Sequence, residues 1–242
     1  MSKKWLMIGG AGIVVLVAAF WFVFFRGDTP DAVDIDAANQ QLDVDNAGSG
    51  DAPGFDGDVD GTWIVDDEIG EFDFETASGS FAGFRVDEEL TVGAVVAVGR
   101  TGGVTGSLTI EGGELVAAEL TVDMTTIVSN DVRREGAIRG AVGASANPTA
   151  TFVLTEPVAL PGGIADGQVV SVEATGELTV NGVTNLTTFA IDALVRDDGF
   201  GLVTGSADIV FADFDVTAPS APIVVSVDDE GIVEFQLVVA KG

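Results

Sequence analysis

From Gly61 to the C-terminus the chain is a series of short runs rich in Val, Thr, Ile, Leu and Phe, separated by turns rich in Gly and Asp. Runs of this length and composition are typical of β-strands, and no helical crossovers lie between them. The pattern therefore predicts an all-β domain built from antiparallel strands. The expected strands are residues 61–65, 80–86, 93–98, 106–111, 114–124, 149–155, 168–180, 187–195, 200–209 and 232–239.

Two turns between these runs carry strong hairpin signals. Gly112-Gly113 separates one pair of alternating runs, and Asn181-Gly182 separates another. Asn-Gly favours a two-residue turn because both of its residues tolerate a positive φ. About ten strands that pair in sequence order favour a closed or nearly closed barrel, because closure leaves few sheet edges exposed.

One segment of the domain, residues 130–139, has helical signals instead. Ser129 or Asn130 can cap such a helix, and Asp131 suits the positive end of its dipole. We therefore expect one short helix among the strands. The segment contains three arginines: Arg133, Arg134 and Arg139.

The N-terminus carries a different signal. Residues 5–25 form an uncharged, mostly apolar run, about 31 Å long as a helix and so long enough to cross a bilayer. A cleaved signal peptide is the alternative, but the aromatic residues that follow residues 17–19 make a poor cleavage site. Two lysines precede the run, and only acids follow Arg26 closely, so the positive-inside rule places the N-terminus in the cytoplasm. We expect residues 1–27 to be a cytoplasmic stub and single-pass anchor in the cell membrane, followed by an extracytoplasmic domain.

Residues 28–60 differ again in composition. They contain ten Asp, no Lys or Arg, and almost no aliphatic periodicity. Such a segment repels itself and has little apolar surface to bury. We expect a disordered acidic linker with a mean span of about 30 Å, which holds the folded domain of residues 61–242 off the membrane.

The composition argues against several functions. The chain has no His and no Cys, which removes imidazole bases, thiol nucleophiles and Cys/His zinc sites. A net charge of -29 disfavours nucleic acid, whose affinity depends largely on Lys and Arg. Residues 56–61 match half of a calcium loop, but they lack flanking helices and read as linker. We expect no enzyme activity, no cofactor, no metal site and no nucleic-acid partner, whereas a homodimer stays open.

Five motifs in the same order resemble the YceI family of lipocalin-like, polyisoprenoid-binding proteins. Residues 61–66 (GTWIVD) are similar to the family's first strand, G-x-W-x-I-D, and residues 175–184 (TGELTVNGVT) to V-x-G-x-L-T-I-x-G-V-T. Residues 122–139 look like the family's strand and short helix. Residues 147–152 (NPTATF) match Y-P-x-I-x-F, and residues 212–216 (ADFDV) resemble R-x-D-F-G-V without its Arg and Gly.

The resemblance covers residues 61–240 and implies an antiparallel lipocalin-like barrel whose lumen holds a long apolar chain of the polyprenyl or quinone type. One departure lies at residues 77–86, where the family carries His and this chain has none. An apolar ligand needs an aliphatic and aromatic wall, and period-2 alternation can direct strand residues into a lumen. The lumen candidates are Phe81, Phe84, Phe152, Phe189, Phe211, Phe214 and Phe235.

Arg133, Arg134 and Arg139 are candidates for holding the pyrophosphate head group of such a ligand. In so acidic a domain, however, each arginine pairs more readily with a nearby Asp or Glu. The leading hypothesis is a membrane-anchored extracytoplasmic protein that encloses an isoprenoid-like lipid for sequestration or transfer. The alternative is a solid barrel that binds another protein through its surface and holds no lipid.

Overall fold

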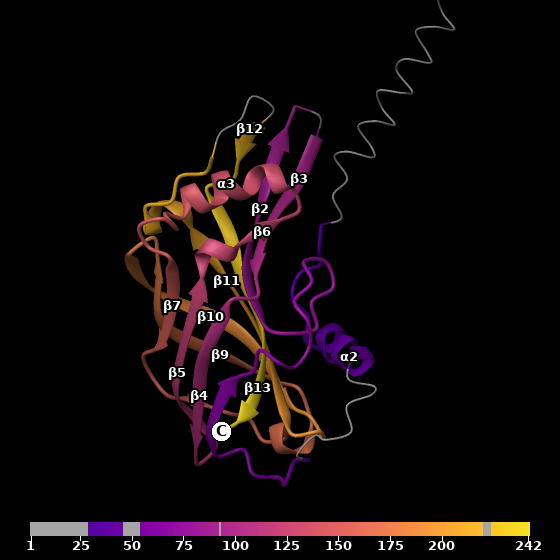
Figure 1. Ribbon diagram of the computed structural model, residues 1–242. Helices are drawn as coiled ribbons and strands as arrows, with labels where there is room; N and C mark the ends of the chain where they lie inside the picture. Colours follow the sequence, from indigo (N-terminus) through magenta and orange to yellow (C-terminus); the bar gives the residue numbers. More distant parts are fainter. Residues whose placement is uncertain (1–28, 46–53, 92, 220–223) are drawn as a thin grey trace, which may run out of the picture.

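The computed structural model describes residues 29–45, 54–91, 93–219 and 224–242, apart from the side chain at position 133. In these ranges the chain forms a β-barrel with two short α-helices on its outside (Figure 1). The predicted anchor at residues 5–25 lies outside the described residues. No helix in the described part of the chain is long and apolar enough to cross a membrane.

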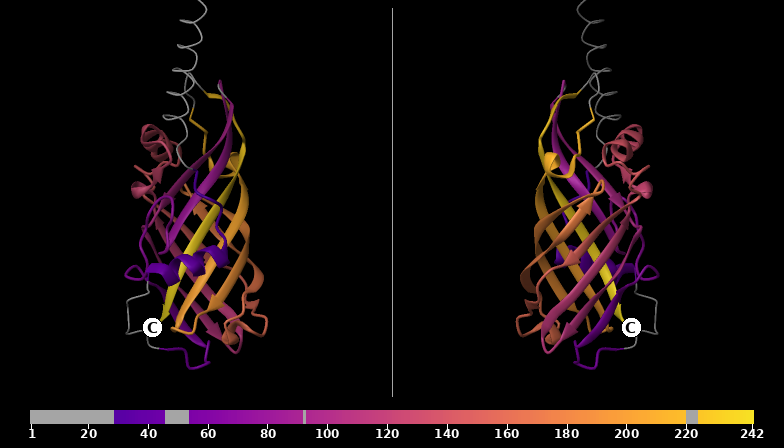
Figure 2. Two further views of the ribbon diagram at one scale, coloured as in Figure 1. Left: turned by 90° about the vertical axis from the view of Figure 1, so that its right-hand side faces the viewer. Right: turned by 90° about the vertical axis from the view of Figure 1, so that its left-hand side faces the viewer.

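Eight strands form the closed wall of the barrel. Figure 2 shows this barrel from two opposite sides. They are β1 (Gly61–Val65), β4 (Val104–Glu111), β5 (Glu114–Asp123), β7 (Thr149–Leu154), β9 (Val170–Val180), β10 (Val183–Val195), β11 (Phe200–Val210) and β13 (Glu230–Lys241). They pair in this order, and β13 pairs back onto β1, so the predicted antiparallel barrel is confirmed.

Further strands extend one end of this wall. They are β2 (Phe81–Leu90), β3 (Gly93–Thr101), β6 (Val128–Ser129) and β12 (Val224–Val227), and β8 (Val158–Ala159) adds to β5. Along β13, residues 239–241 pair with β1, whereas residues 232–236 pair with β2. Strand β1 therefore adjoins β13 at one end, and the β2–β3 pair extends the sheet from β13 toward the other end.

The two ends of the barrel differ in their interior. At the β1 end the lumen is filled by the main hydrophobic cluster, which includes Trp63, Ile110 and Leu115. Trp63 is 2% exposed, and its indole N–H donates to the carbonyl of Val59 at 2.9 Å. We call this the closed end and the opposite end, where β2 and β3 project, the open end.

The helix and the Asn-Gly turn that the sequence predicts are found in the structure. Helix α3 (Val132–Ala141) coincides with the predicted helix and lies at the open end (Figure 1). Asn181 and Gly182 have φ of 52° and 77° in the turn between β9 and β10, which confirms the Asn-Gly hairpin. The remaining turns include three short 3-10 helices, η1 (Met124–Thr126), η2 (Ile164–Asp166) and η3 (Phe211–Phe214).

Residues 29–45, which we call the strap, lie on the outside of the barrel (Figure 2). They include helix α2 (Ile35–Asp45), which is capped by Asp34, since the carboxylate of Asp34 accepts from the Ala37 N–H at 2.8 Å. One face of α2 carries Ile35, Ala38 and Leu42, which are 6%, 4% and 0% exposed. This face packs on outward side chains of three wall strands: Leu194, Leu202 and Val238.

The prediction of a disordered linker over residues 28–60 is therefore wrong for the strap. The average composition is too acidic to suggest folding, but three apolar residues spaced i, i+3 and i+7 form one stripe of a helix. The stripe becomes stable only because the barrel wall presents a matching apolar patch. The short helix predicted within residues 61–242 is confirmed as α3 (Val132–Ala141), and α2 is a second helix outside that range.

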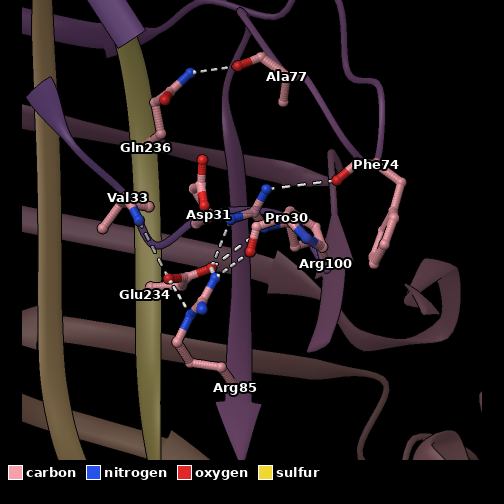
Figure 3. Close-up of polar contacts among 9 residues, drawn as sticks. All are labelled: Pro30, Asp31, Val33, Phe74, Ala77, Arg85, Arg100, Glu234 and Gln236. Atoms are coloured by element: carbon pink, nitrogen blue, oxygen red, sulfur yellow. Dashed lines mark hydrogen bonds and ion pairs between the residues drawn. The ribbon is translucent and has the colours of Figure 1, made fainter. Parts of the chain in front are cut away.

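A cluster of charged side chains lies beneath the strap on the outer face of the wall (Figure 3). Glu234 on β13 bonds Arg85 on β2 at 2.9 Å and Arg100 on β3 at 2.8 Å. The side chain of Glu234 is 1% exposed and that of Arg100 is 4% exposed. We call these three residues the outer charge cluster.

The strap supplies the remaining partners of the outer charge cluster. Its Pro30 carbonyl accepts from Arg85 at 2.9 Å, and its Asp31 carbonyl accepts from Arg100 at 2.6 Å. The Val33 N–H donates to Glu234 at 3.3 Å. The cluster thus fastens the strap to the barrel through backbone groups (Figure 3).

We predict that Glu234→Gln destabilises the protein by about 3–5 kcal/mol, because it leaves the buried Arg100 and the partly buried Arg85 without their counter-charge. Amide hydrogen exchange of residues 29–45 should accelerate together with the loss of stability, since the strap loses its fastening. Denaturant unfolding and exchange mass spectrometry measure the two effects.

Asp43→Asn is the matched control. Asp43 also belongs to the strap and forms an ion pair with Arg196 of the barrel at 2.6 Å, but its side chain is 62% exposed. Exposed pairs contribute about 1 kcal/mol or less. Equal effects of the two substitutions would contradict the special role of the buried cluster.

Candidate functional site

The open half of the barrel is hollow. It holds a cavity of about 530 Å³, within the size range of small-molecule sites. Side chains from β2, β3, β5, β7, β9, β10 and β13 form its wall, and α3 and β12 border it at the open end. Its lining is predominantly aliphatic and aromatic, so the cavity suits an apolar guest.

Phenylalanine rings form much of the lining. The rings of Phe152 and Phe189 lie edge to face with their centroids 5.3 Å apart, and those of Phe189 and Phe235 are 5.5 Å apart. The chain therefore brings aromatic side chains from β7, β10 and β13 into one contiguous surface. The lumen candidates that line the cavity are Phe84, Phe152, Phe189, Phe211, Phe214 and Phe235.

Phe81 does not line the cavity, and the prediction that it faces the lumen is wrong. On β2, Ala82, Phe84 and Val86 point inward, so the odd-numbered residues point outward. Phe81 is nevertheless 2% exposed, because the guanidinium of Arg100 lies over its ring at 4.5 Å from the centroid. The pairing register of β2 decides on which face of the wall Phe81 lies, and the sequence alone did not determine that register.

Glycines make room for these rings in the wall. A Cβ on Gly205 would lie 2.4 Å from the Phe235 ring, and one on Gly176 would lie 2.4 Å from the Phe152 ring. Gly99 stands in the same relation to Phe84, at 2.5 Å. Each ring can therefore lie close against the wall, which leaves the centre of the lumen empty. The sequence alone did not point to these glycines, because the ring that each glycine contacts lies on a different strand.

We predict that Gly205→Ala forces the Phe235 ring away from the wall and into the cavity. Such overpacking should cost about 1–3 kcal/mol in the free energy of unfolding. The control is Gly140→Ala on α3, where a Cβ meets nothing within 4 Å. That change should stabilise by up to about 1 kcal/mol, since alanine favours a helix. If denaturant unfolding gives the same result for both, the glycine does not shape the cavity.

A pair of charged side chains borders the cavity near its open end. Glu88 on β2 and Arg134 on α3 both border it, with Glu88 Oε2 3.1 Å from Arg134 Nη1. Burial raises the pKa of Glu88, and the charge of Arg134 opposes that shift. Asp131 borders the cavity beside them.

The predicted head-group arginines are thus separated. Arg134 is at the cavity, but it is paired with Glu88. Arg139 donates to the carbonyl of Ile127 at 2.9 Å and pairs with Glu135 at 3.6 Å, and it does not line the cavity. The side chain of Arg133 lies outside the described residues. The structure does not bring the three together around one cavity position.

Glu88 is the cavity residue that sequence reasoning missed. The expected strand ended at residue 86, just before the acids at residues 87–89. Continued alternation would have placed residue 88 on the same face as Phe84 and Val86. Among the described residues, no cluster of three or more His, Cys, Asp or Glu side chains could hold a metal ion.

The fold resembles solved structures at low sequence identity. One is BcnA from Burkholderia cenocepacia, with a TM-score of 0.52 and 20% identity over 72% of this chain and 98% of that chain. Another is a polyisoprenoid-binding domain from Saccharophagus degradans, implicated in plant cell wall breakdown, with a TM-score of 0.56 and 16% identity over 75% of this chain and 98% of that chain. These similarities concern the fold.

A search of curated proteins finds no match to this chain. The model of the YceI-like domain, in contrast, matches residues 71–239, which is most of the chain and nearly all of the barrel. This range includes the strands that line the cavity and helix α3. The chain therefore belongs to the family of YceI-like domains.

Proposed function

We propose that the protein binds a long, apolar lipid of the isoprenoid type in the open half of its barrel and sequesters or transfers it without catalysis. The observation that carries this proposal is the cavity of about 530 Å³, with its almost wholly apolar lining and one charged pair near its open end. A solved structure of similar fold, from Saccharophagus degradans, is a polyisoprenoid-binding domain, which supports the same ligand class.

The cavity also bears on the alternative of a solid barrel that binds another protein. Trp63, Ile110 and Leu115 of the main hydrophobic cluster fill the closed half, whereas Phe152 and Phe189 of the same cluster line the hollow open half. A barrel that served only as a surface would gain stability from filling that volume, because each empty space forfeits contacts. The hollow therefore favours a ligand.

The test is to purify the full chain from membranes, extract it with organic solvent and identify bound lipid by mass spectrometry. Ala137→Trp on α3 should lower the amount of bound lipid roughly tenfold, because Ala137 borders the cavity yet is exposed and can carry a larger side chain. Ala190→Trp is the control, since Ala190 is exposed on the outside of β10. Absence of lipid from the parent chain would favour the protein-binding alternative.

We further propose that residues 5–25 anchor the protein in the cell membrane and that the barrel is extracytoplasmic. The support comes from the apolar run and its flanking charges. The strap adds a constraint, because it is fastened to the barrel from Pro30 onward. Residues 26–30 reach at most about 18 Å when extended, so the barrel would lie close to the bilayer rather than on a long tether.

The direction of the strap supports an open end that faces the bilayer. The strap begins beside Glu234, midway along β13, and α2 then packs on Val238, nearer the closed end. Its N-terminal side therefore points toward the open end. Two apolar side chains are exposed at that end, Val132 at 76% and Val225 at 63%. A lipid could then pass between bilayer and lumen over a short distance.

Single cysteines test this orientation, since the chain has no Cys of its own. A fluorophore at Val225→Cys in proteoliposomes of the full chain should be quenched by spin-labelled lipids. The same fluorophore at Glu111→Cys, on an exposed residue beside the β4–β5 hairpin at the closed end, should not be. Quenching at position 111 alone would mean that the closed end faces the bilayer. Quenching at neither position would mean that neither end of the barrel lies close to the bilayer.

A further inference from the structure

The apolar cavity carries one buried acceptor that the protein itself leaves without a hydrogen bond. Glu88 points inward from β2, and its side chain is 9% exposed. Its Oε2 atom is buried and has no hydrogen-bond partner among the described residues. The 3.1 Å approach of Arg134 Nη1 is an ion pair that does not have the geometry of a hydrogen bond.

Such an oxygen costs free energy unless a donor reaches it. The neighbouring side chains are mostly aliphatic or aromatic, and the pKa of Glu88 is raised by burial in them. The missing donor would therefore have to come from the molecule that occupies the cavity. A hydroxyl at the end of an apolar chain has the required chemistry, because it donates while adding no charge.

The charges at the cavity disfavour an anionic head group. Among the side chains that the structure describes, the charged ones that border it are Glu88, Asp131, Arg134 and Glu234. The carboxylate of Glu234 is held by the outer charge cluster, on the other face of the wall. Glu88 and Arg134 pair with each other at 3.1 Å, so the guanidinium of Arg134 is already engaged and is not offered to a diphosphate.

We propose that Glu88 is a specificity-determining residue that selects long-chain apolar lipids ending in a neutral hydroxyl over their diphosphate esters. The hydroxyl donates to Glu88 Oε2, and the apolar chain lies along the Phe152, Phe189 and Phe235 surface. This inference rests on the proposed lipid-binding function and deepens it. It also gives Arg134 a different part from the one predicted, since Arg134 holds Glu88 in place rather than a pyrophosphate.

Three probes with the same chain separate the contributions of donor and charge: geranylgeraniol, its methyl ether and geranylgeranyl diphosphate. The purified full chain should bind the alcohol at least about tenfold more tightly than the ether, because a hydrogen bond to a charged group contributes on that scale. It should also bind the alcohol more tightly than the diphosphate. Calorimetric titration measures the three dissociation constants.

Two variants locate the effect at Glu88. Glu88→Leu should bind the alcohol and the ether equally, and Glu88→Gln should bind the diphosphate more tightly than the parent chain does, because Arg134 is freed. Glu89→Gln is the matched control, since Glu89 is exposed and points outward from the same strand. Thermal unfolding verifies that each variant folds, and the comparison of probes on the parent chain needs no variant.

The outcomes distinguish this inference from the proposed function. If none of the three probes binds, lipid binding fails and the inference fails with it. If all bind but the ether equals the alcohol, or the diphosphate is preferred, the lipid-binding function stands and the role of Glu88 is overturned. A preference for the alcohol that survives in Glu88→Leu would overturn it equally.

Discussion

The alternation of side chains along β13 organises both faces of this protein. Val233, Phe235 and Leu237 point into the barrel, where they border the cavity. Glu234, Gln236 and Val238 point outward, where Glu234 and Val238 hold the strap and Gln236 holds the segment that contains Ala77. Because successive residues of a strand lie on opposite faces, one strand builds the ligand space and fastens the outer layer at the same time. A slip of one residue would bury charge in the lumen and expose the apolar wall.

The outer layer shows how an acidic chain can use few basic residues. The sequence has 10 Lys and Arg against 39 Asp and Glu. Two of these arginines lie in the outer charge cluster, and a third, Arg196, joins the strap to the β10–β11 turn through Asp43 and Asp198. The carbonyls of the strap and of Phe74 accept their remaining hydrogen bonds. The buried cations are therefore satisfied without further acids, and the surplus negative charge stays in solvent.

Local patterns predicted most of the barrel, and the failures have identifiable causes. The hairpin at Asn181-Gly182 and strand β1 were found because a turn or a short run needs only neighbouring residues. Strand β2 was ended too early, just before the acids at residues 87–89, although alternate residues still face inward. The strap was missed because its apolar stripe is only three residues long. In each failure the deciding partner lies far along the chain.

The sequence by itself determined the fold class, the positions of most strands and the helix at the open end, since periodicity and turn chemistry act over a few residues. Only the tertiary structure decided that Phe81 faces outward, that the strap is ordered, and that Glu88 meets Arg134 at the cavity. These outcomes depend on pairing register and on contacts between distant segments, such as the bond from Arg196 to Asn39 across 157 positions. The free energy of those contacts comes from burial that no single segment can provide.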